Sequence, residues 1–167
     1  MRARDSIVVV GVGNDFRQDD GVGWAVVTRL RERAGDGPAA GPVLATCDGD
    51  PGRLIGLWAG ASLAVVVDAA HAHPGRPGRV HRLELAAGGP ARPSSTSSHG
   101  LGLGEAVELA GALDLLPERL VVYAVEGART DFGTGLSPAV AAAVEPLAEA
   151  VEDEIARYRA VAPGRPA

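Results

Sequence analysis

The sequence predicts an α/β protein, a three-layer sandwich in which helices cover both faces of a twisted, mostly parallel five-stranded sheet. Short apolar runs rich in β-branched residues alternate with segments that repeat apolar residues at helical spacing. One run follows the strand before it too closely for a crossover helix, so we expect it to be antiparallel and at an edge. The 167 residues suffice for one domain. We assign it to residues 1–160, with a frayed tail at residues 161–167.

The predicted elements alternate in type until the edge strand interrupts the pattern. Apolar residues recur every four positions from Val22 to Leu30 and indicate the first helix. Asp50 is a candidate N-cap, and Pro51 and Pro138 suit the first turns of two later helices. Strands are expected at residues 5–13, 43–47, 62–70, 80–85 and 119–127, and helices at residues 21–34, 50–61, 99–115 and 138–158.

The composition argues against several classes of protein. The net charge is -5, whereas nucleic-acid binders need a basic face. All 16 basic residues are arginines, which excludes a Walker lysine, a Schiff-base lysine and a lysine general base. A single cysteine, Cys47, is too few for an internal disulfide or a multi-cysteine metal site. No apolar run could span a bilayer, and the N-terminus is interpreted as a strand rather than a signal peptide, so we expect a cytoplasmic protein without a membrane partner.

The glycine-rich turn after the first strand matches a nucleotide site only in part. Gly11 and Gly13 have the spacing of the dinucleotide fingerprint, but Phe16 stands where the third glycine belongs. Asp19 and Asp20 follow close to the start of the first helix, where carboxylates would repel a phosphate group. We therefore expect no nucleotide cofactor, and a nucleotide-binding α/β domain is the weakest of the interpretations considered.

Acidic residues and one histidine follow the ends of the predicted strands. Asp19 and Asp20 lie just beyond the first strand, Asp68 closes the apolar run of the third, and His99 opens a helix. Sites in open α/β sheets lie at the carboxyl ends of the strands, so we expect these residues to meet at one edge. Two carboxylates and one imidazole would offer three ligands to a borderline divalent ion such as nickel or zinc.

Each of these residues also has a simpler interpretation. Asp20, or Asp19 beside it, could cap the first helix. Asp68 could accept hydrogen bonds from nearby loop amides, and His99 could be an ordinary residue at a helix start. Each alternative is reasonable alone, but the convergence of all three residues at one sheet edge favours a common site.

The other candidate groups are less convincing. His71 and His73 are two residues apart, and His81 follows on the edge strand, but their loop-like surroundings suggest surface residues with weak, adventitious metal binding as the minor alternative. Cys47 lies in an apolar strand, where a buried thiol is usually inert. The serines within residues 95–98 lack the G-x-S-x-G elbow of a serine hydrolase.

Five segments, in order, resemble the hydrogenase maturation proteases. Residues 11–23, "GVGNDFRQDDGVG", are similar to the family's G-x-G-N turn and its acidic D-D/E-G-x-G pair. The other similar segments are the strand that closes at Asp68, the serine- and threonine-rich stretch before His99, the last strand and the final helix. The resemblance covers nearly the whole chain and implies the same α/β sandwich. Phe16 replaces a commoner aliphatic residue, and the hairpin at residues 71–80 is particular to this chain.

The resemblance implies an endopeptidase that removes a C-terminal peptide from the nickel-loaded large-subunit precursor of a nickel–iron hydrogenase. By motif position, Asp20, Asp68 and His99 would recognise the nickel and take part in catalysis. The nickel would be supplied by the substrate rather than held permanently. The alternative is a non-catalytic, nickel-checking or chaperone-like partner of the large subunit, which would use the same three residues without hydrolysis.

Three further residues are expected to support this site. Asp19 is interpreted as a capping residue or as a residue behind the metal ligands. Asn14 would hold its loop or donate to the substrate backbone. Glu126 follows the last apolar run and is expected to contact the substrate peptide.

Overall fold

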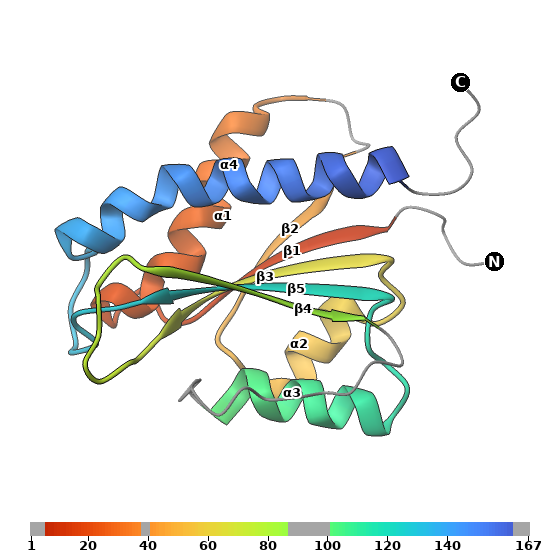
Figure 1. The fold of residues 1–167 in the computed structure, drawn as a ribbon, viewed down its shortest axis with the longest axis horizontal. Helices are drawn as coiled ribbons and strands as arrows, with labels where there is room; N and C mark the ends of the chain where they lie inside the picture. Colours follow the sequence, from red (N-terminus) through yellow and green to blue (C-terminus); the bar gives the residue numbers. More distant parts are fainter. Residues whose placement is uncertain (1–5, 38–40, 87–100, 162–167) are drawn as a thin grey trace.

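The computed structural model describes residues 6–37, 41–86 and 101–161 (Figure 1). Its strands are β1 (Ile7–Val12), β2 (Val43–Cys47), β3 (Leu63–Ala70), β4 (Val80–Ala86) and β5 (Arg119–Glu126). Its helices are the short 3-10 helix η1 (Gln18–Gly21) and the α-helices α1 (Val22–Ala34), α2 (Pro51–Trp58), α3 (Leu101–Ala112) and α4 (Pro138–Val161). The tail predicted at residues 161–167 lies, from residue 162 on, outside the described residues.

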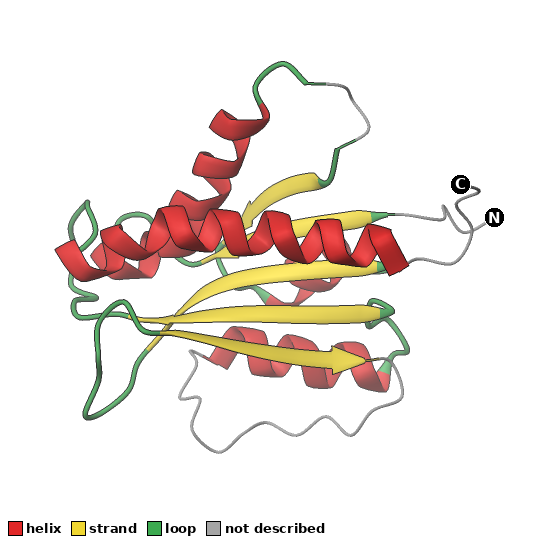
Figure 2. Ribbon diagram, turned by 45° about the horizontal axis from the view of Figure 1, so that its top comes forward, coloured by secondary structure: helices red, strands yellow, loops and turns green. Residues whose placement is uncertain are grey.

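The central sheet has the strand order β2-β1-β3-β5-β4 (Figure 2). β1 pairs in parallel with β2 and β3, and β3 pairs in parallel with β5. β4 lies at the edge and runs antiparallel to β5, with Leu83 opposite Val122. The predicted fold class is therefore confirmed, including the antiparallel edge strand.

Helices cover both faces of this sheet, with α1 and α4 on one side and α2 and α3 on the other (Figure 1). Successive side chains of a strand point to opposite faces. Val9 and Val65 accordingly pack on the side of α1 and α4, and Val10 and Val66 on the side of α2 and α3. All four are fully buried. Burial on both faces explains why these strands are continuous apolar runs in the sequence.

The helix ends follow local signals in part. Asp50 caps α2, where its carboxylate accepts a 2.9 Å hydrogen bond from the backbone N–H of Arg53. Two helices are shorter than predicted, since α2 ends at Trp58 and α3 ends at Ala112. Beyond α3, Asp114 has a left-handed φ of 56°, a conformation that a right-handed helix does not contain.

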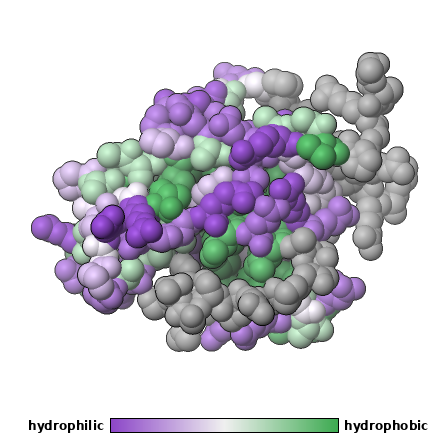
Figure 3. Space-filling view, viewed as in Figure 1, coloured by the Kyte–Doolittle hydropathy of each residue, from purple (hydrophilic) through white to green (hydrophobic). Residues whose placement is uncertain are grey.

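Ion pairs on the surface join α1 to α4. Arg33 of α1 donates a 2.8 Å hydrogen bond to Glu152 of α4, and both side chains are partly exposed. Exposed pairs of this kind contribute little to stability. The face of the molecule in Figure 3 accordingly shows hydrophilic residues between smaller hydrophobic patches. Among the helices that the structure describes, none is long and apolar enough to cross a membrane.

A buried ionic cluster attaches the edge strand to α4. Glu154 of α4 is only 3% exposed, and its carboxylate accepts hydrogen bonds of 2.8 and 3.0 Å from Arg82 of β4. The hydroxyl of Tyr123 on β5 donates a further 2.8 Å hydrogen bond to it. The Arg82 hydrogen bonds lower the pKa of Glu154 to about 2, against the opposing effect of burial. The cluster thus holds β4, β5 and α4 together through one charged group.

We predict that Glu154→Gln lowers the free energy of unfolding by about 3 kcal/mol, because it leaves Arg82 with an uncompensated charge in a largely buried cluster. Glu152→Gln, on the same helix, should leave it nearly unchanged, because that pair is exposed. Denaturant unfolding of both variants at pH 7 measures the difference. Equal losses in the two variants would show that the buried cluster has no special role.

Candidate functional site

Four segments meet at the end of the sheet where the parallel strands finish (Figure 1). They are the turn and η1 after β1, the hairpin between β3 and β4, the loop between β5 and α4, and the start of α3. This is the edge at which sites form in open α/β sheets. Asp68 lies near the end of β3 and Asp20 lies in η1, so the structure brings both predicted carboxylates to this edge.

Asp68 is an acid in an unfavourable environment. It is 7% exposed, and the backbone N–H of Ala69 donates a 2.8 Å hydrogen bond to its Oδ1. Burial raises the pKa of Asp68 to about 7, and the nearby charge of Asp20 raises it further against the effect of the Ala69 hydrogen bond. By the alternation along β3, Asp68 lies on the sheet face covered by α2 and α3. A carboxyl group that exchanges a proton near neutral pH is suited to acid–base chemistry.

Asp20 is half-buried, and its Oδ2 accepts a 3.0 Å hydrogen bond from the backbone N–H of Asn14. Burial raises its pKa, and the Asn14 hydrogen bond and the charges of His71 and Arg17 oppose that increase. The N-cap of α1 is Gly21, and no side chain caps this helix in the described structure. The alternative interpretation of Asp20 as a helix cap is therefore wrong.

Two glycines allow the acidic segment to lie against the strand ends. Gly13 has a φ of 140°, and a Cβ there would stand 1.9 Å from the backbone oxygen of Asp20. A Cβ on Gly23 would stand 2.4 Å from the backbone oxygen of Val67, the residue before Asp68. Any side chain at either position would push η1 and α1 away from the sheet. The glycines therefore bring Asp20 close to Asp68.

Asp19 points into the protein and is fully buried. Its carboxylate accepts hydrogen bonds from the backbone N–H groups of Ala128, Arg129 and Ser137 at 2.7, 2.9 and 2.7 Å. The Ser137 hydroxyl donates a fourth at 2.9 Å. Burial alone would raise the pKa of Asp19, but these four hydrogen bonds together hold it below its ordinary value. Asp19 thus joins the η1 segment to the loop before α4 and caps no part of α1.

The other two predicted supporting residues contact their own chain. Asn14 Oδ1 accepts a 2.9 Å hydrogen bond from the backbone N–H of Phe16, which shapes the turn after β1. Glu126 is 4% exposed and accepts a 3.3 Å hydrogen bond from the backbone N–H of Arg76. Its Oε2 also lies 3.0 Å from Nε2 of His81, and that contact lowers the pKa of Glu126. Glu126 therefore supports the hairpin, whereas we had expected it to face a substrate peptide.

The histidines differ from the prediction at one position. His73 and His81 are exposed, as expected, and His81 contacts Glu126. His71 is half-buried, directly follows β3, and its charge affects the pKa of Asp20. The signal that could have identified it is its position three residues after Asp68, at the end of the same strand.

His99 lies outside the described residues. The first described residue of α3 is Leu101, and Figure 1 shows that α3 begins at the same end of the sheet as the acidic residues. Among the side chains that the structure describes, no three His, Cys, Asp or Glu gather closely enough to hold a metal ion. The predicted ligand set includes His99, so the described part of it consists of Asp20 and Asp68.

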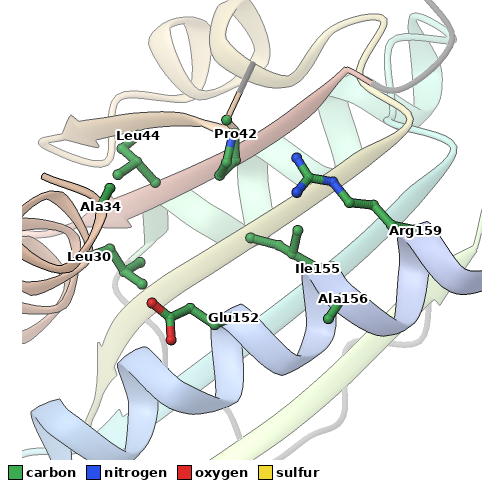
Figure 4. A pocket seen from close by; sticks show the side chains of 9 residues that line it. Leu30, Ala34, Pro42, Leu44, Glu152, Ile155, Ala156 and Arg159 are labelled. Carbon is green, nitrogen blue, oxygen red and sulfur yellow. The ribbon is translucent and has the colours of Figure 1, made fainter. Parts of the chain in front are cut away.

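Two other features lie apart from these carboxylates. Cys47 is 4% exposed, and burial raises the pKa of its thiol, which suits an inert core residue. A cavity of about 430 Å³ lies between α1, β2 and α4, near the amino-terminal end of β2 (Figure 4). Leu30, Leu44 and Ile155 line it together with more polar residues. Because it lies at the opposite end of the sheet, it is not part of the candidate site.

Asp68 should reduce stability at neutral and higher pH. Its folded pKa of about 7 exceeds its ordinary value of 3.8, so the folded protein binds more protons than the unfolded chain between these values. The free energy of unfolding therefore falls across this interval as the pH rises. Relative to wild type, Asp68→Asn should gain up to about 4 kcal/mol between pH 4 and pH 8. Denaturant unfolding at several pH values measures this gain.

The exposed Asp153→Asn on α4 is the matched control for the loss of one negative charge. A difference between Asp68→Asn and wild type that stays constant from pH 4 to pH 8 would contradict the environment described for Asp68.

Comparison with known proteins gives a consistent result. A family model described as hydrogenase maturation protease matches residues 49–154, which include Asp68 and His99 but not Asp20. No curated protein sequence gives a significant match. The NiFe hydrogenase maturation protease HybD from Thermococcus kodakarensis is 23% identical with a TM-score of 0.69, over 90% of this chain and 99% of that chain.

Two solved structures from Escherichia coli have the same fold. The hydrogenase maturating endopeptidase HybD is 24% identical with a TM-score of 0.70, over 91% of this chain and 93% of that chain. The solution structure of an endopeptidase is 24% identical with a TM-score of 0.75, over 94% of each chain. The structural matches establish the likeness of fold, and the family model covers more than half of the sequence. The chain therefore belongs to the hydrogenase maturation protease family.

Proposed function

We propose that the protein is an endopeptidase that removes a C-terminal peptide from the nickel-loaded large-subunit precursor of a nickel–iron hydrogenase. Membership of the hydrogenase maturation protease family supports the class of reaction. The observation that supports the site is the pair of carboxyl groups, Asp20 and Asp68, which burial and mutual repulsion leave with raised pKa values at the sheet edge. Such a pair favours a cation, because a positive charge between two carboxylates removes their repulsion.

Nickel is the substrate's metal in this proposal. Asp20 and Asp68 supply oxygen ligands, and His99 supplies an imidazole nitrogen, which together suit a borderline divalent ion. The precursor arrives with nickel already inserted, and contact with the three side chains places its scissile bond beside the carboxylates. An apo precursor lacks that contact and is left uncut.

The nickel would also change the protonation of the site. Without it, Asp68 has a pKa of about 7 and is substantially protonated at neutral pH. A nearby divalent ion favours the ionised form, so docking of the loaded precursor would release the proton of Asp68. A water molecule activated by the nickel or by a carboxylate then attacks the scissile carbonyl carbon. Recognition of nickel and the supply of a base would thus be one event.

The second candidate function is that of a nickel-checking or chaperone-like partner of the large subunit. The same three residues would bind nickel, but the precursor would keep its C-terminal peptide. Membership of a protease family favours the first function. Intact-mass measurement of the incubated precursor separates the two, because only an endopeptidase shortens it.

We predict that Asp20→Asn, Asp68→Asn and His99→Ala each reduce cleavage of a nickel-loaded precursor by at least about 100-fold, because each removes a nickel contact or a proton acceptor. His73→Ala, an exposed histidine of the hairpin, is the matched control and should cleave like wild type. Quantified product formation by mass spectrometry gives the rates, and unfolding curves verify that each variant is folded. Normal cleavage by all three variants would refute the assignment of the site.

A further inference from the structure

Both phenylalanines of the chain are exposed beside the candidate site. The sequence contains only Phe16 and Phe132, and their exposed fractions are 68% and 81%. Phenylalanine is usually buried, because leaving its ring in water forfeits about 2 kcal/mol of favourable transfer free energy. Exposed aromatic residues are enriched at the centres of protein–protein interfaces. Two of them in adjoining loops therefore suggest a binding surface.

Hydrogen bonds fix the two aromatic residues to each other's loops. The backbone N–H of Gly133 donates a 2.9 Å hydrogen bond to the carbonyl of Phe16, and the N–H of Gln18 donates a 3.1 Å hydrogen bond to the carbonyl of Gly133. Arg17 and Gly133 form an isolated parallel β-bridge. The guanidinium of Arg17 lies 4.6 Å from the centroid of the Phe132 ring, a cation–π distance. The surface is thus preformed, which lowers the cost of binding.

Gln18, between the aromatic residues and the acidic pair, is strained and incompletely satisfied. Its φ of 48° lies in the left-handed region, which is uncommon for a residue other than glycine. Its Oε1 is buried and has no hydrogen-bond partner within the described part of the chain. A buried acceptor without a partner costs stability, so it is often retained for a functional reason.

Gln18 also lines a cleft at this end of the sheet. The cleft has a volume of about 550 Å³ and lies between η1, the hairpin and the start of α4, with Pro77, Leu136 and Pro138 among its lining residues. This volume is in the range of sites that hold small ligands or short peptide segments. Gln18 is two residues from Asp20, so their Cα atoms are at most about 8 Å apart. The cleft therefore adjoins the carboxylates.

We propose that Phe16, Phe132 and the cleft beside Gln18, together called the docking surface, bind the extended precursor segment next to the scissile bond. This inference rests on the proposed function. An extended peptide has unpaired backbone N–H groups, one of which Gln18 Oε1 would accept after a small movement of its side chain. The apolar side chains of the segment would pack on the two rings and on the prolines of the cleft. The docking surface would determine affinity for the precursor, and Asp20 and Asp68 would determine the rate of cleavage.

Two variants test this division. Phe16→Ala combined with Phe132→Ala should raise the KM for the nickel-loaded precursor by about tenfold or more, with kcat within about threefold of wild type. Gln18→Met keeps the length of the side chain and removes the unpaired acceptor. It should raise KM severalfold without lowering the free energy of unfolding. Leu113→Ala removes an exposed apolar side chain just beyond α3 and is the matched control, with KM unchanged.

The outcomes separate the two proposals. If wild type does not shorten the precursor, the proposed function fails. If wild type cleaves and both variants keep the wild-type KM, the docking surface is refuted while the function stands. A loss of self-association by the double variant with an unchanged KM would also refute it, because the occupant would then be a second copy of the chain. If the double variant does not fold, Gln18→Met decides the question.

Discussion

The buried carboxylate of Asp19 joins the two loops on which the geometry of the site depends. Three backbone amides and the Ser137 hydroxyl satisfy its charge, and these groups come from the loop between β5 and α4. That arrangement fixes η1, and therefore the direction of its neighbour Asp20. The adjacent acids of the sequence thus have different tasks. Asp19 organises the loops, and Asp20 lies near Asp68, where we propose that nickel binds.

The charges of the molecule show the same separation between structure and function. Glu154 and Asp19 are buried acids whose hydrogen bonds lower their pKa values, so both are ionised and stabilising at neutral pH. Asp68 is buried with only the Ala69 amide and an opposing carboxylate near it, and its pKa rises to about 7. Proteins commonly sacrifice stability in this way at functional sites. The contrast among three buried acids of one chain is what distinguishes the site from an ordinary structural cluster.

Features that depend on near neighbours could be predicted from the sequence, and features that depend on distant contacts could not. The five strands and the cap at Asp50 follow from local patterns of apolar and capping residues. The partners of Asp19 are 109 to 118 residues away, so no local pattern reveals its role. Glu126 likewise contacts Arg76, 50 residues away, instead of facing outward. His71 was identifiable from its place after β3, but its loop-like neighbours suggested an ordinary surface residue.

The central claim is that nickel in the precursor, recognised by the carboxylates at the sheet edge, permits cleavage. The most direct measurement is the intact mass of the large-subunit precursor after incubation with the wild-type protein, for one precursor preparation divided into nickel-loaded and nickel-free halves. The account predicts that only the nickel-loaded half loses its C-terminal peptide. Equal shortening of both halves, or of neither, would contradict it.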